Sequence, residues 1–153
     1  MQTLPRLRLK QGKEKPILQH HHWIYSGAIA TFPEGGNLAV VESSAGAPLG
    51  IALLSQGHSI SGHMIAFGEE SLEEALRNRL RHALELRRRI FDPAKTNAIR
   101  LINAEGDGIP GLIVDSYANV LVLQISHPAL AALKDLIVSL LIEACNPKAA
   151  PTA

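Results

Sequence analysis

The sequence predicts an α+β fold, in which a small β-barrel is followed by a long helix and then by further strands and a last helix. Hydrophobic residues make up 46% of the 153 residues and charged residues 19%, a balance typical of a globular protein. Up to Gly68, short apolar runs are separated by turn-forming stretches. From Ser71 the apolar residues follow the spacing of an amphipathic helix, so the structural period changes at this point.

The N-terminal part, residues 1–68, is expected to contain about five short strands and little helix, which is typical of a small β-barrel. Pro16 is expected to open a short helical turn, and a turn is expected at SAGA (44–47). The runs that predict strands are LRLK (7–10), NLAVVES (37–43), PLGIALLS (48–55) and SISGHMIAF (59–67).

Residues 71–91 predict a long helix. Ser71 and Glu74 form the S-x-x-E pattern that satisfies backbone donors at a helix start, and Pro93 follows the expected end. The apolar residues that share one face at helical spacing are Leu72, Leu76, Leu80, Ala83 and Leu84.

After this helix the sequence predicts three strands and a helix from Pro128 to about Asn146, with a hairpin turn at SYAN (116–119). The composition shift near Gly68 places the domain boundary there. The expected domains are 1–68, 69–146 and a frayed tail, 147–153. The three strands are AIRLINA (98–104), GLIVDSY (111–117) and ANVLVLQI (118–125).

Charge is distributed in blocks, although the formal net charge is only +1. Residues 1–30 and residues 71–100 each carry an excess of four positive charges, a pattern typical of nucleic-acid binders. For the helix at 71–91 taken alone, a solvated arginine-rich face is the favoured explanation. The most apolar segment, ALAALKDLIVSLLIEAC (129–145), contains a lysine and an aspartate and is too short to span a bilayer, so we expect a soluble, cytoplasmic protein without membrane contact.

Three adjacent histidines, His20 to His22, precede Trp23, the only tryptophan of the chain. Zinc or nickel needs three or four ligands, and the neighbouring sequence supplies no supporting pair, so no metal site is predicted. Trp23 beside Lys13 and Lys15 suits nucleic acid, because a flat ring can stack on a base while cations hold phosphates. It is equally compatible with a core anchor of the barrel.

No catalytic residue is predicted. GDGIPG (106–111) matches G-x-G-x-x-G, but a strand follows it instead of a helix, so it is interpreted as a tight connection between strands. Cys145, the single cysteine, ends an apolar helix and is interpreted as structural.

Two stretches resemble a bacterial family. LKQGKEKPILQHHHWIYSGAI (9–29) and RLINAEGDGIPGLIVDSYANVLVLQ (100–124) are similar to segments of the SAM-dependent rRNA methyltransferases with an N-terminal PUA domain, which include large-subunit rRNA cytosine-5 methyltransferases. The resemblance implies a PUA-like RNA-binding domain at 1–68 and the incomplete start of the middle α+β domain at 69–146. It also implies that the SAM-binding catalytic domain is absent, so this chain alone is expected to be inactive and to hold no cofactor.

Some positions depart from the family pattern. His20 and His22 replace a basic residue and a proline, LLSQGHS (53–59) replaces an asparagine–proline, and His63 and Ser116 stand where basic residues are usual. These changes remove permanent positive charge, so we expect RNA affinity to be weaker and more dependent on acidity than in typical members.

The leading hypothesis is therefore an RNA-binding N-terminal portion of an rRNA methyltransferase. The alternatives are a stand-alone PUA-type RNA adaptor and a non-functional truncated remnant with uncovered apolar strands. Expected partners are RNA, in particular rRNA, and either a second copy or a separate methyltransferase fragment. The expected RNA-binding residues are Lys10, Lys13, Lys15, His21, Trp23, His63, Arg77, Arg81 and Arg100.

Overall fold

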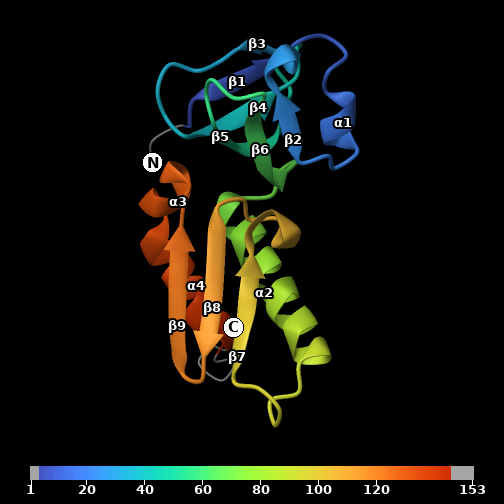
Figure 1. The fold of residues 1–153 in the computed structure, drawn as a ribbon. Coiled ribbons are helices and arrows are strands. Elements are labelled where there is room, and N and C mark those ends of the chain that lie inside the picture. Colours follow the sequence, from blue (N-terminus) through green and yellow to red (C-terminus); the bar gives the residue numbers. More distant parts are fainter. Residues whose placement is uncertain (1–3, 146–153) are drawn as a thin grey trace, which may run out of the picture. The chain divides into compact units, whose positions relative to one another are not determined.

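The computed structural model describes residues 4–145 and divides the chain into two compact units, Met1–Ala75 and Leu76–Ala153 (Figure 1). The division falls within a long helix, α2 (Leu72–Ile90). The presence of α2 confirms the helix expected at 71–91. The mixed α+β class is confirmed as well. The domain limits expected from the sequence remain predictions, and the tail at 147–153 lies outside the described residues.

The first unit is a curled six-stranded sheet that forms a half-barrel, with the strand order β2-β6-β5-β4-β1-β3. A short helix, α1 (Lys15–Leu18), begins at the turn expected for Pro16, and a 3-10 turn, η1 (Ser26–Ala28), separates two strands of three residues each. The six strands are β1 (Arg6–Leu9), β2 (Trp23–Tyr25), β3 (Ile29–Thr31), β4 (Leu38–Glu42), β5 (Pro48–Leu54) and β6 (Ile60–Phe67).

Strand β1 shows how alternation in the sequence builds this sheet. Leu7 and Leu9 are buried in the core of the half-barrel, whereas Arg6 and Arg8 point outward. Strand β1 pairs in parallel with β4, and both arginines donate hydrogen bonds to the buried carboxylate of Glu42. The buried charge is thus paired on both of its oxygens.

This pairing predicts a dependence of stability on pH. The hydrogen bond from Arg6, opposed by burial and assisted by Arg8, lowers the pKa of the Glu42 carboxyl below its ordinary value of 4.5. Because the folded chain binds this proton less readily than the unfolded chain, the contribution is fully present well above pH 4.5 and is lost as the pH falls through the lowered pKa. We expect urea unfolding between about pH 7 and about pH 3 to show this loss in the wild type.

We expect Glu42→Gln to be less stable than the wild type at neutral pH and to lose less stability on acidification. Glu34→Gln, at an exposed position of the same unit, is the matched control and should keep the acid dependence of the wild type. An acid dependence that is identical in Glu42→Gln and the wild type would contradict the assignment.

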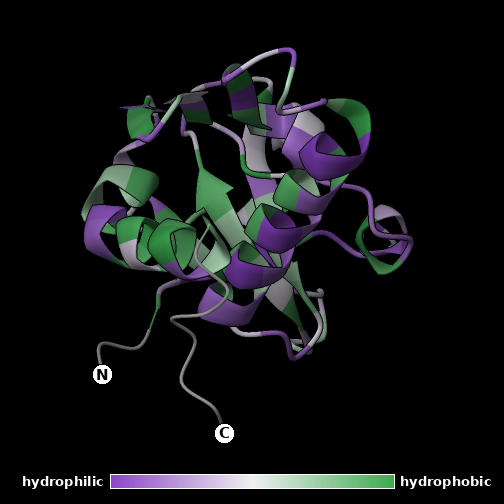
Figure 2. Cartoon of the chain, turned by 90° about the horizontal axis from the view of Figure 1, so that it is seen from below, coloured by the Kyte–Doolittle hydropathy of each residue, from purple (hydrophilic) through white to green (hydrophobic). Residues whose placement is uncertain are grey.

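The second unit contains a three-stranded antiparallel sheet in the order β7-β8-β9, as the three predicted strands require. Helices α2 and α4 lie on one face of this sheet (Figure 1), where the buried residues of strands and helices meet. Figure 2 shows hydrophilic and hydrophobic residues alternating around the long helix. The remaining elements are β7 (Ala98–Asn103), η2 (Ala104–Asp107), β8 (Leu112–Tyr117), β9 (Val120–Ile125), α3 (Pro128–Ala132) and α4 (Lys134–Cys145).

The expected start of α2 is confirmed. The hydroxyl of Ser71 accepts a hydrogen bond from the backbone N–H of Glu74 at 3.2 Å, and the Glu74 carboxylate accepts from the backbone N–H of Ser71 at 2.9 Å. These bonds satisfy donors that a helix N-terminus leaves open. The bonds from Ser71 also lower the pKa of Glu74.

The prediction of a single helix from Pro128 is wrong in one respect. The structure has two helices, α3 and α4, with an interruption at Leu133. The backbone N–H of Leu133 donates to Leu130 three residues earlier, which tightens the chain and ends α3. Leu130 and Ile137 on either side of the break are both fully buried, so packing of the two short helices decides their direction. The predicted end near Asn146 lies outside the described residues. Among residues 4–145, no helix is long and apolar enough to cross a membrane.

Candidate nucleic-acid interface

Strand β2 presents two aromatic side chains on the surface of the first unit. It lies at the edge of the sheet and alternates outward, inward and outward. Trp23 is 41% exposed and Tyr25 48% exposed, whereas Ile24 between them is buried against Gly62. Trp23 is therefore a surface residue, and its interpretation as a core anchor is wrong.

The three histidines divide into two groups. The rings of His20 and His22 contact Phe67 of β6, with ring centroids 4.7 and 5.2 Å from that of Phe67. His20 has a positive φ of 60°, and both residues precede β2. His21 contacts Trp23 instead, with ring centroids 6.0 Å apart. Within residues 4–145, no group of three or more histidine, cysteine or carboxylate side chains is arranged to hold a metal ion.

Hydrogen bonds of Lys10 tie the basic N-terminal segment to the residues that follow this strand. The ammonium group of Lys10 donates to the carbonyl oxygen of Gly27 at 2.9 Å, just after Tyr25. The backbone N–H of Lys13 in turn donates to the carbonyl of Lys10, which folds the turn back on itself. Lys13 and Lys15 are exposed.

His63 lies opposite Trp23 in the register of β2 and β6 and is half-buried. Directly opposite residues in an antiparallel pair share one face of the sheet. Of the six residues expected from the first unit, His21, Trp23 and His63 lie on or beside β2, and the ammonium of Lys10 is bonded to Gly27 just after it. Lys13 and Lys15 lie on the exposed segment between β1 and β2, where Pro16 accepts a backbone hydrogen bond from His21.

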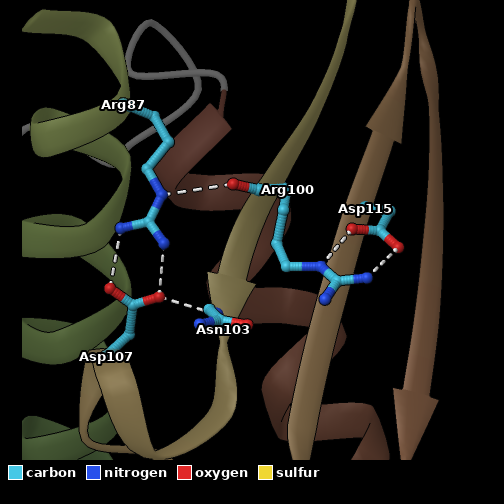
Figure 3. A network of polar contacts seen from close by, with 5 residues as sticks. All are labelled: Arg87, Arg100, Asn103, Asp107 and Asp115. Atoms are coloured by element: carbon cyan, nitrogen blue, oxygen red, sulfur yellow. Dashed lines mark hydrogen bonds and ion pairs between the residues drawn. The ribbon is translucent and has the colours of Figure 1, made fainter. Parts of the chain in front are cut away.

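The three expected arginines lie in the second unit, and each has a side-chain partner there. Arg77 is paired with the carboxylate of Glu143, and Arg81 donates to the side-chain oxygen of Asn78 at 3.2 Å. Arg100 forms a two-pronged ion pair with Asp115 at 2.8 and 3.1 Å (Figure 3). This hydrogen bonding lowers the pKa of Asp115 and raises that of Arg100.

The turn between β7 and β8 contains GDGIPG and is a tight connection between antiparallel strands, as predicted. Gly108 and Gly111 have positive φ angles of 73° and 85°, a region that favours glycine. Asp107 of this turn accepts two hydrogen bonds from Arg87, at 2.7 and 2.6 Å, and a third from the backbone N–H of Asn103 at 2.6 Å (Figure 3).

Cys145 is half-buried at the end of α4. Burial raises the pKa of its thiol, which disfavours the thiolate that a nucleophile requires. This environment agrees with a structural role.

Sequence reasoning missed Tyr25 as a candidate binding residue. The available signal was the spacing of Trp23 and Tyr25 around an aliphatic residue, because side chains two apart in a strand share a face. An alternation of only three residues is too short to predict a strand.

Comparisons with known proteins identify a PUA-like domain in the N-terminal unit and find similarity to ribosomal RNA methyltransferases. Residues 7–67 match the family of PUA-like domains. The chain is 36% identical to the ribosomal RNA large subunit methyltransferase I of Alteromonas mediterranea over 76% of its own length and 31% of the relative. It is 32% identical to the protein of the same name from Shewanella frigidimarina over 90% of the chain and 36% of the relative. The chain thus spans about a third of the length of these relatives.

Solved structures show the same fold. A Streptococcus mutans protein assigned as a SAM-dependent methyltransferase matches with a TM-score of 0.74 at 21% identity, over 94% of this chain and 38% of that one. A second structure, assigned as a methyltransferase and complexed with SAH, matches with a TM-score of 0.73 over the same shares of the two chains.

The glycine-rich turn at 106–111 does not have the context of a SAM site. A nucleotide-type cofactor is held where a glycine-rich loop joins a parallel strand to a helix N-terminus. The glycine-rich turn at 106–111 instead joins two antiparallel strands, β7 and β8.

Proposed function

We propose that this chain is an RNA-binding portion of an rRNA (cytosine-5) methyltransferase. Two findings support the proposal: the chain carries a PUA-like domain, and it is homologous to the N-terminal part of the ribosomal RNA large subunit methyltransferases I. In this role it positions structured rRNA in the cytoplasm, and methyl transfer from SAM requires a part that residues 4–145 do not supply. Phosphate contacts give affinity and register without chemistry.

The observation that carries the proposal is the exposed basic turn of the first unit. Lys10, Lys13 and Lys15 follow one another along a turn anchored to η1 by the Lys10–Gly27 hydrogen bond. Glu14, the single acid of this turn, offsets only one of the three lysines, so the net charge of the turn is positive. Ammonium groups on a fixed turn are suited to phosphate oxygens along a strand of RNA. His21 and His63 are proposed as weaker contacts, and Arg77, Arg81 and Arg100 as contacts that would have to exchange their present partners.

The experiment is binding of the chain to a fluorescently labelled rRNA fragment, followed by anisotropy across a salt series. We expect Lys13→Ala/Lys15→Ala to bind more weakly than the wild type and to lower the slope of log affinity against log salt by about 1.4–1.8, since each phosphate contact contributes about 0.7–0.9.

The matched control is Lys95→Ala/Lys134→Ala, which removes the same charge from exposed positions of the second unit. It should leave the slope nearly unchanged. An equal loss in both double variants would indicate non-specific attraction, and no binding at low salt would reject RNA binding altogether.

A further inference from the structure

Three side chains of the first unit form a compact group, which we call the aromatic triad: His21, Trp23 and Tyr25. The centroids of the Trp23 and Tyr25 rings are 6.4 Å apart, and the ring planes are nearly perpendicular, at 88°. His21 lies 6.0 Å from Trp23 and 6.4 Å from Tyr25. Trp23 and Tyr25 are 41% and 48% exposed as whole residues, so each retains contact area for a ligand.

This geometry does not match a helical stack of bases. In a duplex, bases follow one another at about 3.4 Å along each strand and lie parallel. Rings at 88° and 6.4 Å can receive two neighbouring bases only if these have left the stack and turned away from each other. Such bases occur in loops, bulges and single strands, where proteins read them by stacking on aromatic side chains.

We propose that the aromatic triad binds unpaired nucleotides of RNA, with one base stacked on Trp23 and the adjacent base on Tyr25. The inference rests on the proposed RNA-binding function and specifies the class of RNA that this surface recognises.

His21 is oriented for a polar contact with the same nucleotides. Its Nδ1 lies 3.2 Å from the backbone N–H of Trp23, which donates to it. The same Nδ1 also lies 3.2 Å from the carbonyl oxygen of Trp23, so in either tautomer Nδ1 is engaged by the backbone and Nε2 is the ring nitrogen left for a polar contact with a phosphate or a base edge. The basic turn flanks the triad at both ends, because the ammonium of Lys10 is bound to Gly27 beyond Tyr25 and the backbone N–H of His21 donates to Pro16, next to Lys15. Positive charge therefore borders the stacking surface, as a nucleotide backbone requires.

The test uses intrinsic fluorescence, because Trp23 is the only tryptophan of the chain and reports directly on stacking. The probes are a single-stranded oligouridylate of about a dozen nucleotides, whose bases stack little on one another, and the same strand paired with oligoriboadenylate. This length lies within the range of about 4–16 nucleotides that small single-strand binding domains cover. We expect the single strand to quench Trp23 emission and to bind more tightly than the duplex at equal salt.

We expect Tyr25→Ala to weaken binding of the single strand by about 5- to 150-fold, the range for loss of one base stack, and to change duplex binding little. Tyr25→Leu retains apolar bulk but not the flat ring, and it should weaken binding to a similar degree. Tyr117→Ala, which removes an equally exposed tyrosine from the second unit, is the matched control and should bind like the wild type.

The outcomes separate this inference from the proposed function. Equal affinity for single strand and duplex, without quenching of Trp23 but with loss of binding in Lys13→Ala/Lys15→Ala, would overturn the stacking site and leave RNA binding in place. Wild-type affinity in Tyr25→Leu would also overturn it, since bulk alone would then suffice. Failure of both probes and of the rRNA fragment to bind would overturn both.

Discussion

Gly50→Ala is expected to destabilise the chain by roughly 3–5 kcal/mol, the largest effect among the substitutions considered. Gly50 lies in β5 between β4 and β6 and has a φ of 137°, a conformation that an L side chain rarely adopts. A Cβ at this position would lie 2.1 Å from the carbonyl oxygen of Ala66 and 2.9 Å from the side chain of Met64. Both the strand pairing and the core would have to shift.

The measurement is urea unfolding followed by Trp23 fluorescence, which reports on the first unit. Gly27→Ala is the matched control, because Gly27 is exposed and an added Cβ would meet nothing within 4 Å. We expect the control to unfold within about 0.5 kcal/mol of the wild type. A Gly50→Ala variant as stable as this control would show that the close approach of β5 and β6 is not required.

Asp107→Ala is expected to destabilise the second unit by about 3 kcal/mol. Asp107 is only 7% exposed and Arg87 13% exposed, so the pair is largely removed from water. The substitution removes both hydrogen bonds from Arg87 and the one from the Asn103 backbone (Figure 3). It leaves a guanidinium group with little solvent and without its carboxylate, which costs more than the loss of an exposed pair.

Far-UV circular dichroism during urea unfolding measures this effect, since helices α2 and α4 belong largely to the second unit. Glu105→Ala removes the same charge from an exposed position of the same turn and should be nearly neutral. If Glu105→Ala and Asp107→Ala lose equal stability, the turn responds to its net charge and not to the Arg87 contact.

Local patterns in the sequence were enough to predict the longer strands and the long helix α2, but not the three-residue strands β2 and β3. The S-x-x-E pattern at Ser71 and the alternation in β1 each depend on neighbours along the chain, and the structure contains both as predicted. The glycine-rich turn before β8 was predictable for the same reason, because two glycines with positive φ have a local cause.

Contacts between distant segments were not predictable in this way. The partner of Arg77 is 66 positions away in the sequence, and Arg87 is held by a turn 20 positions away. No glycine or proline in the sequence marks the break at Leu133. We attribute the break to the packing of the buried residues on either side of it. The expected RNA contacts stay predictions, although the structure adds Tyr25 to the residues from which they are drawn.

The shared carboxylate of Glu42 has a consequence for the speed of encounter with a polyanion. Arg6 and Arg8 are both bound to Glu42, so the three side chains together carry one net positive charge at a fixed place. Attraction at long range depends on such net charge and weakens as ionic strength rises, whereas contact at short range depends on groups free to move. Under the proposed RNA-binding function, this fixed charge would add to the long-range attraction that the lysines of the basic turn exert on RNA, most strongly at low salt.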